Sequence, residues 1–98
     1  MSELTITRED QPTRGRYVAR IDGINAEAEM TFSKASDTLI IADHTSVPDA
    51  FRGRGVGRAL FDRLVGDARK GGVKIVPLCP FVNAERRKRP EWSDVFQT

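Results

Sequence analysis

The spacing of hydrophobic residues changes near the middle of the chain, and this change limits the possible folds more than any other feature. Before residue 38 the hydrophobic residues alternate with polar ones, as in strands with one face in water, whereas the stretch 39–42 is continuously apolar, as in a central strand. From Val56 to Lys70 they recur at intervals of three and four, which predicts a helix that ends at Gly71-Gly72. The longest alternation is made by Ile24, Ala26, Ala28, Met30 and Phe32.

Four strands are therefore expected before the helix and one after it. The first begins at Leu4, the second carries Tyr17, Ala19 and Ile21 on one face, and Asp22-Gly23 predicts a hairpin to the third. The fourth runs over about 38–47, and 73–79 forms the fifth. A strand, a helix and a strand in succession predict a right-handed βαβ crossover with parallel strands. A short helix should follow Cys79 and end at Pro90, with 92–96 packing back as an anchor. The expected fold is α/β (α+β), with a mixed and mostly antiparallel sheet of about five strands.

Length and cysteine content limit the size and the compartment. The 98 residues, of which 39% are hydrophobic, suffice for a single domain over 1–98 with one modest core. Cys79 is the only cysteine, so no intramolecular disulfide can form and a reducing compartment is expected. No signal peptide and no membrane span is evident. We expect a cytoplasmic protein without a metal site.

Positive charge and glycine gather where the helix begins. Residues 1–51 carry five basic and nine acidic side chains, whereas 52–98 carry eleven basic and five acidic ones. The stretch FRGRGVGRAL, residues 51–60, lies at the start of the basic half. The first N–H groups of a helix have no partner within it, and glycines let a phosphate approach them. A phosphate-bearing ligand is therefore expected at Arg52–Arg58, with a flexible turn as the alternative.

The motifs around this loop resemble those of a known family. Arg52-x-x-Gly55-x-Gly57 follows a strand that ends in Val47-Pro48, which is similar to the pyrophosphate motif of the GNAT superfamily of acyl-CoA-dependent N-acyltransferases. HTSVP, at 44–48, and PLCPFV, at 77–82, resemble the signatures of a very small GNAT subfamily of about 100 residues, as does a late Pro-x-Trp at 90–92. The resemblance covers about 16–95 and implies acetyl transfer from acetyl-CoA to an amine.

The resemblance also implies where coenzyme A would bind. The backbone of Thr45, Ser46 and Val47 would pair with the pantetheine arm, and the N–H groups of Arg54 through Arg58 would hold the pyrophosphate. Asn83 would contact the cofactor arm. The complete cofactor-binding set is Thr45, Ser46, Val47, Arg52, Gly53, Arg54, Gly55, Val56, Gly57, Arg58 and Asn83. Larger members have helices between their first two strands, whereas DQPTRG here predicts only a loop. The acceptor cleft should therefore be open, and a protein or peptide amine is a possible acceptor.

His44 and Cys79 are the expected catalytic residues. His44 is the only histidine, and histidine is the side chain that most often acts as a general base. Strict alternation puts His44 on one face with Ala42, and Cys79 on one face with Ile75. If these faces coincide, both side chains reach the cofactor sulfur. Cys79 would then be an acyl-accepting nucleophile, an acid that protonates the departing thiolate, or only a lining residue.

Two other functions remain open from the sequence. The chain could bind CoA or acyl-CoA without transfer, as a sensor or partner-binding module. The basic run ERRKR, 85–89, could bind nucleic acid, but the interleaved aromatic residues that such binding normally uses are missing. A solvated helix face is the favoured interpretation of this run, and nucleic acid is the least favoured partner.

Overall fold

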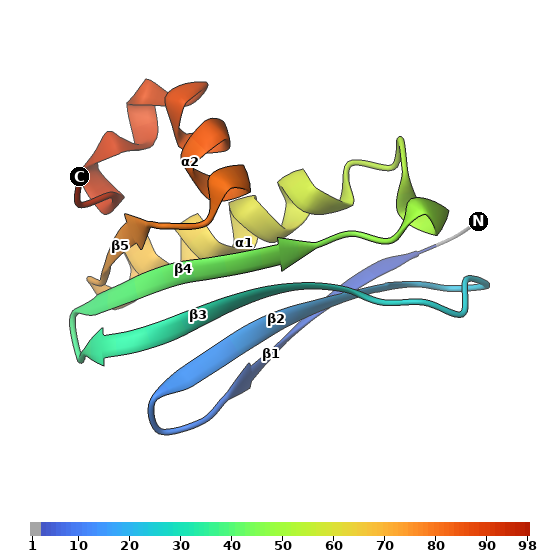
Figure 1. Ribbon diagram of the computed structural model, residues 1–98, viewed down its shortest axis with the longest axis horizontal. Coiled ribbons are helices and arrows are strands. Elements are labelled where there is room, and N and C mark those ends of the chain that lie inside the picture. The colour runs from blue at the N-terminus through green and yellow to red at the C-terminus, as the bar shows by residue number, and fades with distance from the viewer. Residues whose placement is uncertain (1–2) are drawn as a thin grey trace.

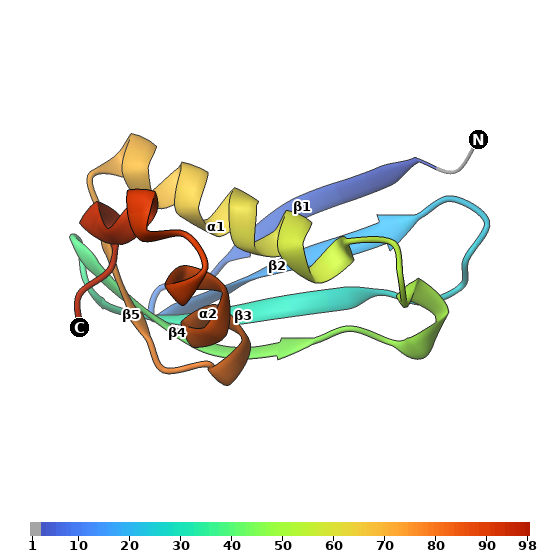
Figure 2. The ribbon, with the colours of Figure 1, turned by 90° about the horizontal axis from the view of Figure 1, so that it is seen from above.

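A computed structural model describes residues 3–98 as one curved sheet with both α-helices on the same face (Figure 1). Figure 2, viewed from above, shows α1 crossing over β1 and β2, and α2 lying nearer β4 and β5. The strands are β1 (Leu4–Asp10), β2 (Arg14–Ile21), β3 (Ala28–Ser36), β4 (Leu39–Ser46) and β5 (Lys74–Pro77). The helices are α1 (Val56–Gly71) and α2 (Pro80–Arg87), with short 3₁₀ helices η1 (Asp49–Phe51) and η2 (Pro90–Val95).

The strands lie in sequence order across the sheet, from β1 to β5. Each of the first four is antiparallel to its neighbour, whereas β4 and β5 are parallel. The expected mixed sheet and its βαβ unit are thereby confirmed. The helix also ends as expected, because Gly72 adopts a left-handed conformation with φ of 69° and its N–H caps the last turn.

The third strand starts later than the alternation predicts. Residues 22–27 form a loop, and β3 begins only at Ala28. The N–H of Ile24 donates to the carbonyl of Ile21 at 3.1 Å, which closes a turn around Gly23. Gly23 has a φ of 87°, a value that favours glycine. Ile24 and Ala26 still pack against the core from this loop, which explains why their spacing looks like that of a strand.

The C-terminal segment packs on α1, as predicted. The ring of Trp92 stacks on Phe61 with a centroid distance of 5.8 Å, and Phe96 does so at 5.9 Å. Phe96 also forms a parallel bridge with Ile75, and the N–H of Gln97 donates to the Ile75 carbonyl at 2.8 Å. The tail therefore covers part of the open edge of β5, which would otherwise expose unpaired backbone groups.

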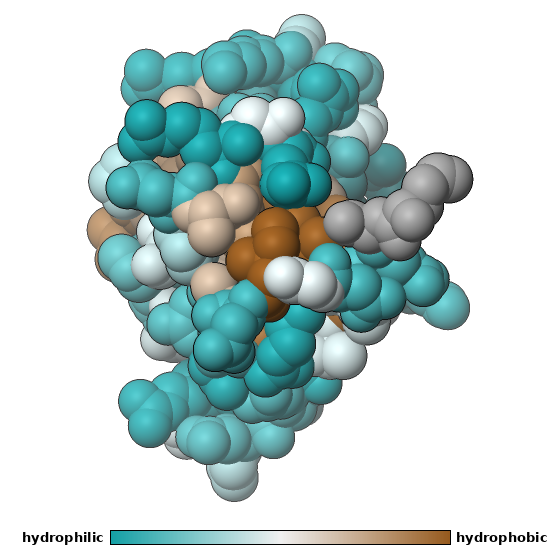
Figure 3. All heavy atoms as spheres, turned by 90° about the vertical axis from the view of Figure 1, so that its right-hand side faces the viewer, coloured by the Kyte–Doolittle hydropathy of each residue, from teal (hydrophilic) through white to brown (hydrophobic). Residues whose placement is uncertain are grey.

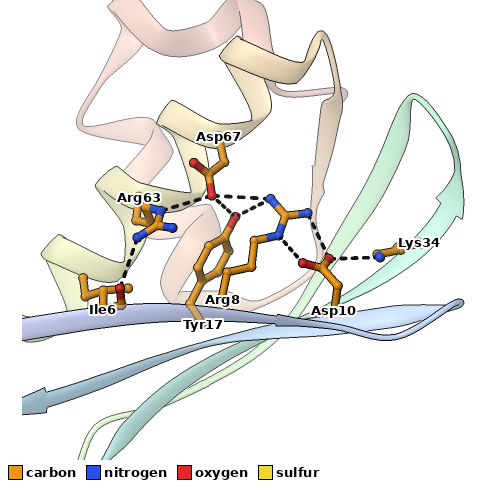
Figure 4. A network of polar contacts seen from close by, with 7 residues as sticks. All are labelled: Ile6, Arg8, Asp10, Tyr17, Lys34, Arg63 and Asp67. Carbon is orange, nitrogen blue, oxygen red and sulfur yellow. Dashed lines mark hydrogen bonds and ion pairs between the residues drawn. The ribbon is translucent and has the colours of Figure 1, made fainter.

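A polar network fixes α1 over the first strands (Figure 4). The hydroxyl of Tyr17, a fully buried residue, donates to Asp67 Oδ2 at 2.9 Å. Arg63 Nε donates to the same oxygen at 3.1 Å, and Arg63 Nη1 donates to the carbonyl of Ile6. Arg8 donates to the Tyr17 hydroxyl at 3.1 Å. These contacts join α1 to β1 and β2 at the periphery of the core.

Within residues 3–98, no helix covers the opposite face of the sheet (Figure 1). The side chains that β2 and β3 place on it are largely polar. We refer to it as the outer face. None of the helices within residues 3–98 combines the length and the apolar character that a membrane-crossing helix needs. Figure 3 looks at the end of the molecule where β4 ends, and hydrophobic side chains gather there inside a hydrophilic rim.

Candidate acyl-CoA site

A β-bulge near the end of β4 decides which side chains face the helices. Phe32 on β3 is opposite Ala42, but Thr31 is opposite His44, so Asp43 is an extra residue without a counterpart. The bulge interrupts the alternation. Thr45 consequently lies opposite the buried Met30, on the helix-covered face.

The faces that carry His44 and Cys79 therefore do not coincide, so the condition for both side chains to reach the cofactor sulfur from one face is not met. His44 is exposed opposite Thr31, on the outer face, because the bulge shifts the alternation by one residue. Cys79 belongs to the core cluster on the helix side and is only 2% exposed. The side chain that meets its thiol is that of Thr45, with Oγ1 and Sγ 3.3 Å apart.

The strands β4 and β5 separate where the resemblance places the pantetheine arm. Their pairing ends at Ala42 and Pro77, and a last hydrogen bond joins the N–H of Cys79 to the Ala42 carbonyl at 2.7 Å. Beyond this point Thr45 and Ser46 are paired with β3 alone. The other edge of this part of β4 has no strand partner in the described chain, so an extended ligand can hydrogen-bond there.

The glycine-rich loop leaves a set of backbone donors free at the start of α1. Gly53 and Gly55 have φ values of 76° and 70°, so the chain turns sharply before the helix begins. Within residues 3–98, no acceptor bonds the N–H groups of Gly55, Val56, Gly57 or Arg58. The first turn of α1 contains no acidic residue to oppose the positive end of the helix dipole.

The prediction for Arg54 needs correction. Its N–H donates to the carbonyl of Phe51 at 3.2 Å, and this bond closes the turn before the helix. The expected donor series therefore begins at Gly55 rather than at Arg54. Among the arginine side chains of the loop, Arg52 pairs with Asp49 at 3.0 Å, whereas those of Arg54 and Arg58 form no ion pair with any described residue.

These groups surround a hollow of about 390 Å³, which we name the loop hollow. Its walls come from the end of β4, the glycine-rich loop and one side of α2. The lining residues are Thr45, Val47, Phe51, Arg52, Gly53, Gly55, Val56, Gly57, Arg58, Phe81 and Glu85. A Cβ on Gly57 would come within 2.9 Å of the Phe81 ring, so any larger residue there would have to displace this ring.

The loop hollow contains most of the residues predicted to bind the cofactor. Eight of them line it: Thr45, Val47, Arg52, Gly53, Gly55, Val56, Gly57 and Arg58. Ser46, Arg54 and Asn83 do not line it. Ser46 is exposed opposite Glu29, and the amide oxygen of Asn83 accepts a hydrogen bond from Arg86 Nε at 2.8 Å.

Sequence reasoning missed Phe81 and Glu85 as wall residues. Both belong to α2, and they point to the loop hollow because Val82, between them, packs into the core. Residues 81 and 85 are four apart and therefore share one face of a helix, so their spacing in the sequence could have indicated a common wall. Phe51, buried at 1% exposure, both lines the hollow and anchors the loop in the core.

Comparisons with known proteins agree with this geometry. The family model described as GCN5-related N-acetyl-transferase matches residues 16–95. The solution structure of a GCN5-like protein from Staphylococcus aureus, proposed to be an N-acetyltransferase, superposes with a TM-score of 0.70 at 30% identity. The match covers 93% of this chain and 87% of that protein. No curated protein sequence matches significantly. Because the family model spans most of the chain and the fold agrees, this protein belongs to the GCN5-related N-acetyltransferase family.

Proposed function

We propose that the protein transfers the acetyl group of acetyl-CoA to an amine, with coenzyme A bound in the loop hollow. The observation that carries the proposal is the row of free N–H groups at Gly55–Arg58, beside the point where β4 and β5 separate. A pyrophosphate would accept hydrogen bonds from this row, and Arg58 would add a charge-assisted one. The pantetheine arm would then extend along the open edge of β4 toward Thr45.

The residues fit this ligand on two independent grounds. The loop hollow is positively charged at the helix start, where phosphates would lie, and it is apolar at Val47 and Phe81, where the arm would pass. The edge of β4 beyond Ala42 supplies backbone partners for amide groups, in the manner of an added strand. Both features would place the ligand along one path, which runs from the glycine-rich loop toward the thiol of Cys79.

The transfer itself forms one bond and breaks another. The amine nitrogen attacks the thioester carbonyl carbon, a C–N bond forms, and the C–S bond breaks as coenzyme A leaves as a thiolate. One amine proton must be removed, and one must reach the leaving sulfur. We propose that His44, on the outer face, takes the proton from an amine that arrives on that side. Cys79, on the helix side, would protonate the thiolate.

A covalent relay is the second mechanism to be tested. In it the Cys79 thiolate attacks the thioester, coenzyme A leaves, and the amine then attacks the acyl-cysteine. The burial of Cys79 and its contact with the Thr45 hydroxyl favour direct transfer, because attack would require the thiol to leave that partner. Intact-mass detection of an acetylated protein in the absence of amine, lost in Cys79→Ala, would establish the relay instead.

The first test is titration calorimetry with CoA and acetyl-CoA at physiological salt. Arg58→Glu should weaken binding by about tenfold or more, because it places a carboxylate against the pyrophosphate. Arg54→Glu is a matched control, since Arg54 lies in the same loop and is also unpaired, but does not line the hollow. Equal losses in the two variants, or no binding by the folded wild type, would overturn the proposed site.

A thiol-release assay then separates an enzyme from a binding module. Release of CoA thiol that requires both an amine and Cys79 supports transfer. Tight binding of acetyl-CoA without amine-dependent release, across primary amines and lysine peptides, would make the chain a non-catalytic acyl-CoA-binding module. Activity that persists unchanged in both Cys79→Ala and His44→Gln would remove these residues from the mechanism.

A further inference from the structure

A second hollow lies on the outer face of the sheet, and neither the cofactor site nor the core accounts for it. It has a volume of about 470 Å³ and extends over β1, β2, β3 and β4. Thr31 and Ser33, which are small, form its floor on β3. Longer side chains rise on both sides, from Arg14 and Arg16 on β2 and from Asp43 on β4. We name it the outer hollow.

Some charged side chains around the outer hollow are paired with an opposite charge, and others are not. Arg16 is neutralised, because its guanidinium pairs with Glu9 at 2.9 Å and with Glu29 at 2.8 Å. Arg14 and Asp43, in contrast, form no ion pair with any residue among 3–98. The hollow therefore offers one unpaired cation and one unpaired carboxylate on opposite sides of its floor.

The hydrogen bonds of these two residues leave their charged ends open to a ligand. Arg14 uses Nε to donate to the amide oxygen of Gln11 at 3.2 Å, and its two terminal nitrogens bond no residue among 3–98. Asp43 uses Oδ2 to accept from the Ser33 hydroxyl at 2.5 Å, so Oδ1 remains free. Each group is held by one neighbour. The terminal nitrogens of Arg14 can therefore bind a carboxylate, and Oδ1 of Asp43 can bind an ammonium.

The register sets the distance between the two strands that carry these groups. Arg14 is opposite Ser33 on β3, and Ser33 is in turn bonded to Asp43 on β4. The backbones of β2 and β4 are two strand spacings apart, about 10 Å. A ligand that bridges them must carry its anionic and cationic groups at separate ends, as the side-chain amine and the carboxylate of lysine are.

The outer hollow adjoins the place where transfer would occur. Asp43 is the bulged residue of β4, it is followed by His44 on the same face, and Thr45 then lines the loop hollow. Beyond Ala42 and Pro77 the strands β4 and β5 no longer pair, so the sheet is open between the two faces at this level. An amine held at Asp43 on the outer face therefore lies next to the opening that leads to the thioester.

We propose that the outer hollow binds the acceptor, and that this acceptor is a zwitterionic amine of lysine-like length. This inference rests on the proposed transferase function. Its carboxylate binds the terminal nitrogens of Arg14, and its ammonium binds Asp43 until it loses one proton to solvent; the neutral amine then attacks, and its second proton passes to His44. Arg14 and Asp43 thus select acceptors with an anionic group at the far end.

The experiment compares lysine with cadaverine, which is lysine without its carboxylate. In the thiol-release assay, lysine should show a KM about tenfold below that of cadaverine, as expected for one charge-assisted contact. Arg14→Gln should raise the KM for lysine to that of cadaverine and leave cadaverine unchanged. Arg20→Gln is the matched control, since Arg20 lies on the same strand but outside the hollow and pairs with Glu27.

Heteronuclear NMR of isotope-labelled protein provides a readout that needs no turnover. Titration with lysine should shift the amide signals of Thr31, Ser33 and Asp43, and Arg14→Gln should abolish these shifts. If acetyl-CoA binds but lysine shifts no signal at the outer hollow, the acceptor proposal fails and the transferase proposal stands. If acetyl-CoA does not bind, the transferase proposal fails. Equal KM values for lysine and cadaverine, unaffected by Arg14→Gln, would also overturn the zwitterion specificity.

Discussion

Removing the hydroxyl of Tyr17 tests whether the network in Figure 4 stabilises the fold. Tyr17→Phe keeps the buried ring and its packing against Phe32, whose centroid lies 5.5 Å away. It removes one donor to Asp67, at 2.9 Å, and one acceptor for Arg8, at 3.1 Å. The substitution therefore isolates the polar contribution from the hydrophobic one.

The expected loss follows from the partners that remain. A hydrogen bond to a charged group contributes about 1.5–3 kcal/mol. Asp67 keeps its bond from Arg63, and its side chain is 26% exposed, so water replaces part of what is lost. We expect the free energy of unfolding to fall by about 2 kcal/mol, which corresponds to a decrease in Tm of roughly 8–16 °C for a chain of this size.

Thermal and urea unfolding, followed by circular dichroism, would measure this loss. Asp67→Asn and the double variant complete a cycle that gives the coupling energy between the two residues. A loss below about 0.5 kcal/mol for Tyr17→Phe, with no coupling to Asp67, would show that solvent satisfies these groups equally well and would refute the argument.

The remaining predictions concern pH and the glycines. Burial raises the pKa of Asp67, but hydrogen bonds from Tyr17 and Arg63 outweigh it and hold the pKa below its ordinary value; Arg8 likewise lowers the pKa of Asp10. The stability they contribute is present above about pH 4 and is lost as pH falls through the lowered pKa values, so acid unfolding should be less steep in Asp67→Asn. Burial and the bond to Asp67 raise the pKa of Tyr17, so stability should fall above about pH 10 in the wild type and less in Tyr17→Phe. Gly57→Ala should displace Phe81, which its Cβ would approach to 2.9 Å, and weaken CoA binding by about tenfold in calorimetry. Gly66→Ala, where the added Cβ has no neighbour within 4 Å, should stabilise α1 by about 0.5–1 kcal/mol in urea unfolding.

Local patterns were enough to predict the order and type of the elements. The spacing of apolar residues over 56–70 and the glycines at 71–72 located α1, because one face of a helix must be buried. The parallel pairing of β4 and β5 followed from the helix between them. The start of β3 was predicted wrongly, since Ile24 and Ala26 reach the core from a loop and alternation alone cannot distinguish that from a strand.

The arrangement of the site was predictable only where the strands keep their two-residue alternation. The glycine-rich loop and Thr45, which the motif singled out, line one hollow, and their role in binding coenzyme A stays a prediction. The relative position of His44 and Cys79 could not be predicted, because the bulge at Asp43 leaves no mark in the hydrophobic pattern and yet moves His44 to the other face. The outer hollow was also not foreseen, since it depends on residues that meet only through the register of four strands.

The attachment of α1 along its length has a consequence for ligand affinity. The helix carries its free N–H groups at Val56–Arg58 and is fastened to the sheet at Arg63 and Asp67, on average about 12 Å further along its axis. Because α1 is fastened along its middle part and packed against the core, it holds the donors at its start in preorganised positions. A phosphate that binds there loses little free energy to ordering the backbone, so affinity at the loop depends in part on hydrogen bonds that never touch the ligand.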